Sequence, residues 1–369
     1  MNNSPIKQMN LPKNDFLFAS QKRLNANFAG YHSSWSLFWK RFFSNKINYL
    51  WLALFLGFML YLILASTIYK YSPTKPVLDS EIAINLPNYY DANVERTFNP
   101  DSPFLKLILE TNKKFSNLKI VSNYKQIGDV FLVDYNPYQL IYALSGQKYI
   151  LLFGTNYQKI DRFSFFNHAM GISVLITLIA ISIQLFLGSL LGSILGFYSN
   201  KTSSKMSFHL INIINVLPFL IISILLFKII NYSFWNAIWI LGLFGSIGFF
   251  YTSYANTINI KNAEFITAYK VLGMSNKQII WKIIMLENCW MNLSLIADNL
   301  ALDLLVLASL AFFNVKGITS SLNIGNVFQD LINDLSNVSY LLYVIILTSL
   351  YVLLSKFLSL ALYQAYLVK

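Results

Sequence analysis

Charged side chains are scarce in this chain of 369 residues, where Asp, Glu, Lys and Arg together make up 12%. Soluble globular domains carry about 25%. Apolar residues make up 56% of the chain, and the mean hydropathy is +0.50. A soluble globule of this length does not fit such a composition, which indicates a chain embedded in a lipid bilayer.

Cysteine and histidine are almost absent. Cys289 is the only cysteine, so no disulfide can form within the chain. His32, His168 and His209 are scattered along the sequence. We therefore expect no metal site, and we interpret each histidine as an ordinary polar or interfacial residue.

Sequence motifs for chemistry are also missing. The chain holds no G-x-x-x-x-G-K-[ST] loop for nucleotide phosphates and no G-x-S-x-G or H-E-x-x-H segment. We expect no catalytic residue and no cofactor bound by this chain. The formal net charge is +12, but basic and aromatic residues do not cluster on a soluble segment, so no nucleic-acid partner is expected.

Long apolar runs are abundant, and six reach the roughly 20 residues that cross a hydrocarbon core of about 30 Å. Pro218 lies inside the third run and is expected to bend it, because proline removes a backbone hydrogen bond. The first run follows a long polar segment without a small-residue cleavage site, so we expect a retained anchor instead of a signal peptide. The predicted spans are 47–69, 169–198, 208–230, 234–254, 290–313 and 339–367.

Lysine and arginine predict the orientation of the spans. The N-terminal segment 1–46 is expected to be cytoplasmic because its basic residues oppose only Asp15. Six spans then return the C-terminus to the cytoplasm as well. The basic residues of this segment are Lys7, Lys13, Lys22, Arg23, Lys40, Arg41 and Lys46.

The segment 70–168 is long and its charges nearly balance, which predicts an extracytoplasmic insertion. Ser102 and Pro103 are expected to open a helix, and the runs LKIVS, DVFLVDY and KYILLF are expected to be strands. The insertion is therefore predicted to be a small α+β module. Either it docks an external binding protein or it is a passive structural insertion.

A short amphipathic block, 262–288, lies between two apolar runs inside the predicted cytoplasmic loop 258–288. Gly273 interrupts its helical spacing, and Ser275 with Gln278 can cap a second helix. The block therefore predicts a helix, a glycine turn and a second helix that lie against something outside the bilayer. The apolar positions are Phe265, Ala268, Tyr269 and Leu272 in the first helix, and Ile279, Ile280, Ile283 and Ile284 in the second.

Small residues recur at four-residue spacing within the second predicted span, which is typical of close helix contacts. We expect Gly188, Gly192 and Gly196 to pack against another helix. Sliding of these helices during gating is the alternative. A further row of glycines in the fourth span, Gly242, Gly245 and Gly248, predicts a second close contact.

Two carboxylates, Asp298 and Asp303, lie within the fifth predicted span, where a charge is costly unless it faces protein or water. At 100° per residue they point about 140° apart, so they cannot act as a pair. Asp303 and Asn299 form a polar stripe, and we expect Asp298, Asn299 and Asp303 to contact a translocation path. For Asp303 the alternative is a structural hydrogen bond to a neighbouring helix.

From about residue 151 to the end, the chain resembles the C-type permease of oligopeptide and dipeptide ABC importers. The segments LLGSILGFYS and GLFGSIGFFY, the Leu217–Pro218 pair and FWKRFFSNK carry the resemblance. Lys159 and Ile160 depart from the family motif near its first core span. Further matching positions are Gly154, Thr155, Asn156, Asp161, Ser164, Ile172, Ser173, Ile324, Gly325 and Asn326.

The block 262–288 is similar to the EAA loop of that family, whose first helix docks in a groove of the ATPase subunit. Thr267 stands where the family has Glu, Tyr269 replaces its second Ala and Leu286 replaces Pro. Glu264, one turn earlier, could supply a carboxylate. By resemblance, the ATPase-coupling residues are Glu264, Phe265, Thr267, Ala268, Tyr269, Leu272, Gly273 and Ile283.

The resemblance implies an all-α polytopic fold in a bacterial plasma membrane, with six spans, a permease core over 169–367 and the α+β insertion after the first span. It implies a second, homologous permease, two ATPase subunits that bind ATP and Mg, an extracytoplasmic peptide-binding protein and a peptide substrate. Other cargo, such as dipeptides or nickel, remains an alternative. A secondary transporter would show internal repeats, and a membrane-anchored ectodomain protein would need only one span.

Overall fold

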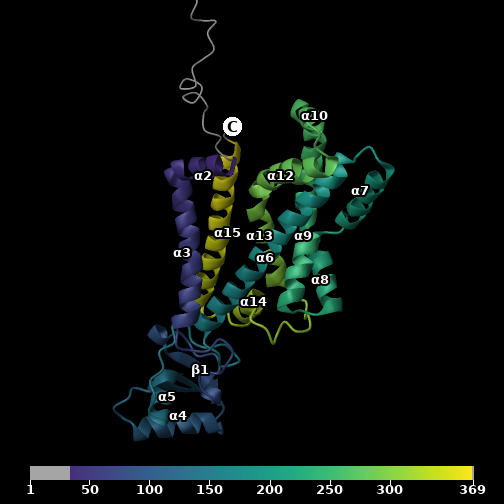
Figure 1. Cartoon of the computed structure of the whole chain (residues 1–369). Helices are drawn as coiled ribbons and strands as arrows, with labels where there is room; N and C mark the ends of the chain where they lie inside the picture. The colour runs from purple at the N-terminus through teal and green to yellow at the C-terminus, as the bar shows by residue number, and fades with distance from the viewer. Residues whose placement is uncertain (1–33, 368–369) are drawn as a thin grey trace, which may run out of the picture.

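The computed structural model describes residues 34–367 (Figure 1). Long helices run between two ends of the molecule. A small domain that contains a sheet lies at one end, and the helical hairpin around α10 lies at the other, together with the C-terminus. The basic residues at positions 7–23 lie outside the described residues.

Within residues 34–367, five helices are long and apolar enough to cross a membrane, and a bent pair makes up to six. The pair consists of Thr202–Asn215 (α7) and Phe219–Ile230 (α8), which meet at 83°. Pro218 stands at the break, so the predicted bend is confirmed. The five helices are Lys46–Ile68 (α3), Arg162–Phe197 (α6), Phe234–Ile260 (α9), Asn276–Ser309 and Val338–Leu367 (α15).

Helix α6 begins at Arg162, seven residues before the predicted span. Asp161 caps it by accepting a hydrogen bond from the Ser164 backbone N–H at 2.7 Å. The Arg162 side chain is buried in ion pairs, which is why a hydropathy pattern misses this first turn. The insertion is correspondingly shorter than 70–168, and His168 belongs to α6.

The helix Asn276–Ser309 joins two features that the sequence analysis treated separately, the second helix of the loop and the span predicted at 290–313. Its hydrogen-bond pattern changes along its length, but the chain does not leave the helix. Its parts are Asn276–Ile279 (α11), a π-helical turn at Ile280–Ile284 (η4), Met285–Met291 (α12), a 3-10 turn at Asn292–Leu295 (η5) and Ile296–Ser309 (α13).

Two shorter helices lie at opposite ends of the bundle (Figure 1). Ser34–Ser44 (α2) packs Phe38 and Phe42 against Ala361 and Ala365 near the end of α15. Ile324–Asn333 (α14) lies at the end that carries the insertion and contacts α13 and α6. Each therefore ties neighbouring long helices together at one end.

The insertion is an α+β module with its own core. Its three-stranded antiparallel sheet has the order β1-β3-β2, and the core includes Ile108, Val133 and Leu140. The elements are Glu81–Ala83 (η2), Tyr89–Asp91 (η3), Val94–Phe98 (β1), Pro103–Lys114 (α4), Val121–Ile127 (β2), Val130–Tyr135 (β3) and Pro137–Ser145 (α5).

The helix expected after Ser102 is confirmed as α4, and DVFLVDY contains β3. LKIVS contributes only the start of β2, and KYILLF is not a strand. Leu151 of that run is buried beside Leu86 and Ile141, and it joins Tyr89 through a single backbone hydrogen bond of 3.1 Å. Burial, not sheet pairing, therefore explains its apolar character.

Candidate coupling and translocation sites

The hairpin at the end opposite the insertion has the geometry that the loop sequence predicts. Its first helix is Glu264–Val271 (α10), and Gly273 turns the chain with φ +83°, which L side chains rarely adopt. Ser275 and Gln278 form a capping box at the start of α11. The predicted sequence of helix, glycine turn and helix is confirmed.

One face of this hairpin is anchored and the other is open. Ile266 is fully buried against Ile279 and Ile284, and Ile283 packs at the edge of this cluster. By contrast, Phe265 is 48% exposed and Tyr269 37% exposed, and their rings meet edge-to-face at 6.5 Å. Glu264, Thr267, Ala268, Val271, Leu272 and Gly273 are also exposed.

Most of the exposed side chains of α10 are apolar, but Glu264, Thr267 and Lys270 on the same helix are polar and exposed as well. An exposed apolar patch of this kind marks a contact surface. Ile283, which the resemblance groups with the coupling residues, is half-buried and packs against the cluster that anchors the hairpin, and its part in coupling stays a prediction.

Helices α6 and α9 approach very closely along the predicted glycine row. An added Cβ at Gly192 would lie 2.5 Å from Ser253 Cβ and 2.7 Å from the Phe250 carbonyl oxygen. Gly188 and Gly196 meet α9 in the same way. The packing interpretation of this row is confirmed.

Beside the glycines runs a series of hydrogen bonds that joins three helices. Asn292 donates from Nδ2 to Ser189 Oγ of α6 at 2.9 Å and to Ser253 Oγ of α9 at 2.8 Å. One turn away, Asn288 donates from Nδ2 to Ser193 Oγ and Thr257 Oγ1, both at 2.8 Å. We call these six residues the polar ladder. They are Ser189, Ser193, Ser253, Thr257, Asn288 and Asn292.

Asp303 lies further along the same contact and is fully buried. Its Oδ2 accepts a hydrogen bond from Gln184 Nε2 at 2.8 Å, and the same nitrogen contacts the Leu241 carbonyl oxygen at 3.1 Å. The hydrogen bond to a neighbouring helix, which the sequence offered as the alternative for Asp303, is therefore present. A place for Asp303 on a translocation path stays a prediction.

Asp298 faces another direction, as the 100° rule requires. Its Oδ1 pairs with Lys356 Nζ of α15 at 2.5 Å, and these two side chains are 56% and 42% exposed. Asn299 is half-buried and donates to the Leu295 carbonyl oxygen. Lys356 was not predicted as the partner of Asp298, because a pairing between residues 58 positions apart leaves no local signal in the sequence.

A second charged cluster lies at the end that carries the insertion. Arg162 pairs through Nε with Asp330 at 3.3 Å and through Nη2 with Asp334 at 2.5 Å, and its guanidinium lies over the Tyr340 ring. Burial raises the pKa of Asp330 even though Arg162 opposes the shift. Burial also acts on Asp334, but hydrogen bonds from Ser336 and Arg162 prevail and lower its pKa. This cluster ties the start of α6 to the end of α14 and the approach to α15.

Some residues of the family resemblance meet in this region. Thr155 Oγ1 accepts a hydrogen bond from the Leu86 backbone N–H at 2.9 Å, and Ser173 Oγ accepts one from the Ile324 backbone N–H at 3.1 Å. Asp161 is buried at the start of α6, and this burial raises its pKa to about 7. Ser173 therefore holds the start of α14 against α6, whereas Thr155 joins two segments within the insertion.

Comparison with known proteins agrees with this architecture. Residues 188–366 match the family described as the inner membrane component of binding-protein-dependent transport systems. This stretch makes up just under half of the chain and is similar to that class of multi-pass transport permeases. It contains the polar ladder, the α10 hairpin and nearly all of α15.

The chain is also similar to a named oligopeptide permease. The oligopeptide transport system permease protein AmiD of Streptococcus pneumoniae is 26% identical over 185 residues. These residues make up 50% of this chain and 59% of that protein, so the match spans less than two thirds of the relative. The resemblance to oligopeptide permeases drawn from the motifs is confirmed.

Proposed function

We propose that this chain is the transmembrane permease subunit of an ATP-driven oligopeptide importer. It forms half of a translocation pathway, and a second, homologous permease forms the other half. Two ATPase subunits bind ATP and Mg, and an extracytoplasmic binding protein delivers the peptide. The name of the Streptococcus pneumoniae relative supports peptide as the cargo.

The outward apolar face of α10 carries the proposal. Phe265, Ala268 and Tyr269 lie on a short helix beyond the bundle, at the end that also holds α2 and the C-terminus (Figure 1). We place this end in the cytoplasm and α10 in a groove of an ATPase subunit. Because Ile266 and the capped helix α11 fix the hairpin to the long helix Asn276–Ser309, movement of the docked hairpin is transmitted directly to a membrane span.

The exposed pair Asp298–Lys356 supports a position for the pathway. Both residues belong to membrane-spanning helices, and a charge at the bilayer centre costs at least about 2.5 kcal/mol. We place this face of α13 and α15 against water or the second permease instead of lipid. Asn299 and Asp303 lie on the same helix. Asp303 is buried in the contact with α6 behind this face, and we place it next to the pathway from that side.

Ala268→Asp tests the coupling element, because it places a carboxylate in the open face of α10. An unpaired charge buried at a protein contact costs several kcal/mol. We expect the variant to lose ATPase association and peptide-stimulated ATP hydrolysis in the reconstituted complex. Ser203→Asp is the matched control, since Ser203 is exposed on α7 and does not belong to the hairpin.

The result that overturns the proposal is normal ATPase binding and normal stimulation in Ala268→Asp. The pathway is tested separately by exchanging the charges of Asp298 and Lys356. Each single reversal is expected to impair peptide uptake, and the double exchange is expected to restore it because the ion pair re-forms. Equal uptake in all three variants would remove the pair from the pathway.

A further inference from the structure

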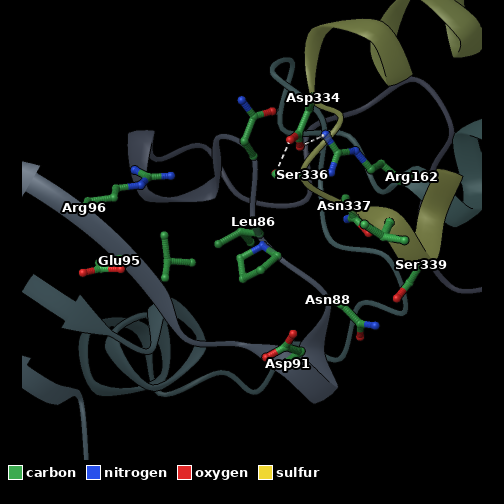
Figure 2. A pocket seen from close by; sticks show the side chains of 14 residues that line it. Leu86, Asn88, Asp91, Glu95, Arg96, Arg162, Asp334, Ser336, Asn337 and Ser339 are labelled. Carbon is green, nitrogen blue, oxygen red and sulfur yellow. Dashed lines mark hydrogen bonds and ion pairs between the residues drawn. The ribbon is translucent and has the colours of Figure 1, made fainter.

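A cavity of about 420 Å³ lies where the insertion meets the start of α15 (Figure 2). This volume falls within the range of small-ligand pockets. One wall is formed by residues 85–96 of the insertion, and the other by Arg162 and residues 334–339. The cavity therefore lies at the extracytoplasmic end of the bundle in the orientation proposed above.

Some charged side chains around this cavity are already in ion pairs, and others are not. Arg162 and Asp334 are already paired with each other. Among the described residues, no ion pair within 4 Å involves Arg96, Asp91 or Glu95. The cavity wall thus holds a cation and carboxylates whose charges are open to a ligand.

Arg96 and Asp91 come from different elements, since Arg96 lies on β1 and Asp91 ends η3. Glu95 directly precedes Arg96 on β1, so its side chain leaves the opposite, exposed face of the strand. Figure 2 shows Arg96 and Asp91 on opposite sides of Leu86. Ser339 and the amide of Asn88 add neutral polar groups to the lining. A ligand that spans the cavity meets a positive group at one end and a negative group at the other.

We propose that this cavity binds a short zwitterionic peptide, with its carboxylate at Arg96 and its ammonium at Asp91. The inference rests on the proposed function, because that function makes peptide the cargo, and it adds a binding site within the permease chain. The bidentate geometry of arginine suits a carboxylate. Serine hydroxyls and asparagine amides suit the peptide groups between the two termini.

The site is also connected to the membrane helices. Arg162, in the cavity wall, is the first residue of α6, and Asp334 precedes α15 by four residues. A peptide in the cavity therefore lies against the ion-pair cluster that holds these two helices and α14 together.

The test uses the full-length chain in lipid nanodiscs and titration calorimetry with three probes: trialanine, its C-terminal amide and its N-acetyl form. Arg96→Gln is expected to weaken trialanine binding about tenfold or more, and to leave the amide unaffected. Asp91→Asn is expected to weaken trialanine similarly, and to leave the N-acetyl form unaffected. Lys125→Gln is the control, because it removes a positive charge from β2, at the far edge of the same sheet.

Arg96→Lys keeps the charge and is expected to restore most of the affinity for trialanine. Failure of trialanine to bind the wild-type chain overturns the inference. So does a result in which Arg96→Gln and Asp91→Asn bind like Lys125→Gln, or in which Arg96→Gln and Arg96→Lys lose all three probes alike. Peptide uptake by the reconstituted complex distinguishes failure of this inference from failure of the proposed function. If the complex imports peptide and the cavity binds none, only this inference fails, whereas a complex that imports no peptide refutes the proposed function.

Discussion

Replacing Gly192 by alanine is expected to force α6 and α9 apart. The new Cβ would lie 2.5 Å from Ser253 Cβ, whereas ordinary van der Waals contact begins at 3.4 Å. The helices must therefore separate by up to about 0.9 Å, the difference between these two distances, because backbone atoms of Phe250 and Tyr254 prevent the methyl group from turning aside.

This separation also acts on the polar ladder. The bond from Asn292 Nδ2 to Ser253 Oγ measures 2.8 Å, and a shift of that size would lengthen it to about 3.7 Å, beyond hydrogen-bonding distance. Overpacking costs about 1–3 kcal/mol, and a lost hydrogen bond between membrane helices costs about 0.6 kcal/mol more. We expect Gly192→Ala to lower the free energy of unfolding by the sum of these two terms, about 2–4 kcal/mol.

Gly171→Ala is the matched control. Gly171 lies on the same helix, and a Cβ there meets nothing within 4 Å. Alanine should stabilise this position by up to about 1 kcal/mol through helix propensity. The measurement is reversible unfolding of both variants in mixed micelles, monitored by circular dichroism. Equal stability of Gly192→Ala and wild type would refute the close contact between α6 and α9.

Three further outcomes are expected. Burial raises the pKa of Asp161 to about 7 from its usual 3.8, so its contribution to stability is present below pH 4 and is lost as pH rises through 7. Asp161→Asn should remove up to about 4 kcal/mol of this pH dependence from the free energy of unfolding, and a pH profile like that of the wild type contradicts the assignment. In a Cys289→Ser background, an impermeant maleimide should label Asn123→Cys on intact cells but not Asn276→Cys, and the reverse pattern would invert the proposed orientation. Asp303→Asn should leave assembly intact and change peptide uptake by an amount that depends on the charge of the peptide. If the variant takes up every peptide as the wild type does, Asp303 makes only the structural hydrogen bond.

Local sequence signals predicted much of the fold. Hydropathy located the long helices, because an 18- to 20-residue apolar run has few alternatives to a span. Pro218, Gly273 and the Ser275–Gln278 pair each act within one or two turns of the backbone, and all three have the predicted effect. The start of α5 carries a signal of the same kind, with Asn136 as its cap and Pro137 in its first turn, but this helix was not predicted.

Features that depend on residues far apart in the chain were not predictable in this way. Arg162 marks the end of a span in a hydropathy pattern, and only its pairing with Asp330 and Asp334 keeps it within the helix. In the sequence, Lys356 is an isolated cation, and only the packing of α13 beside α15 places Asp298 next to it. The polar ladder requires three helices at once, so Asn288 and Asn292 carry no distinctive signal of their own.

The polar ladder repeats every four residues on each of its three helices. Ser189 and Ser193 are equivalent positions, as are Ser253 and Thr257, and Asn288 and Asn292. Moving the asparagine helix along its axis by this four-residue repeat, about 6 Å at 1.5 Å per residue, would bring one asparagine into the place that the other had left and would leave the other without its partners. Smaller displacements would leave both amides without partners in a medium that offers no water. The polar ladder therefore opposes axial sliding of this helix in either direction and favours a single register of the three helices.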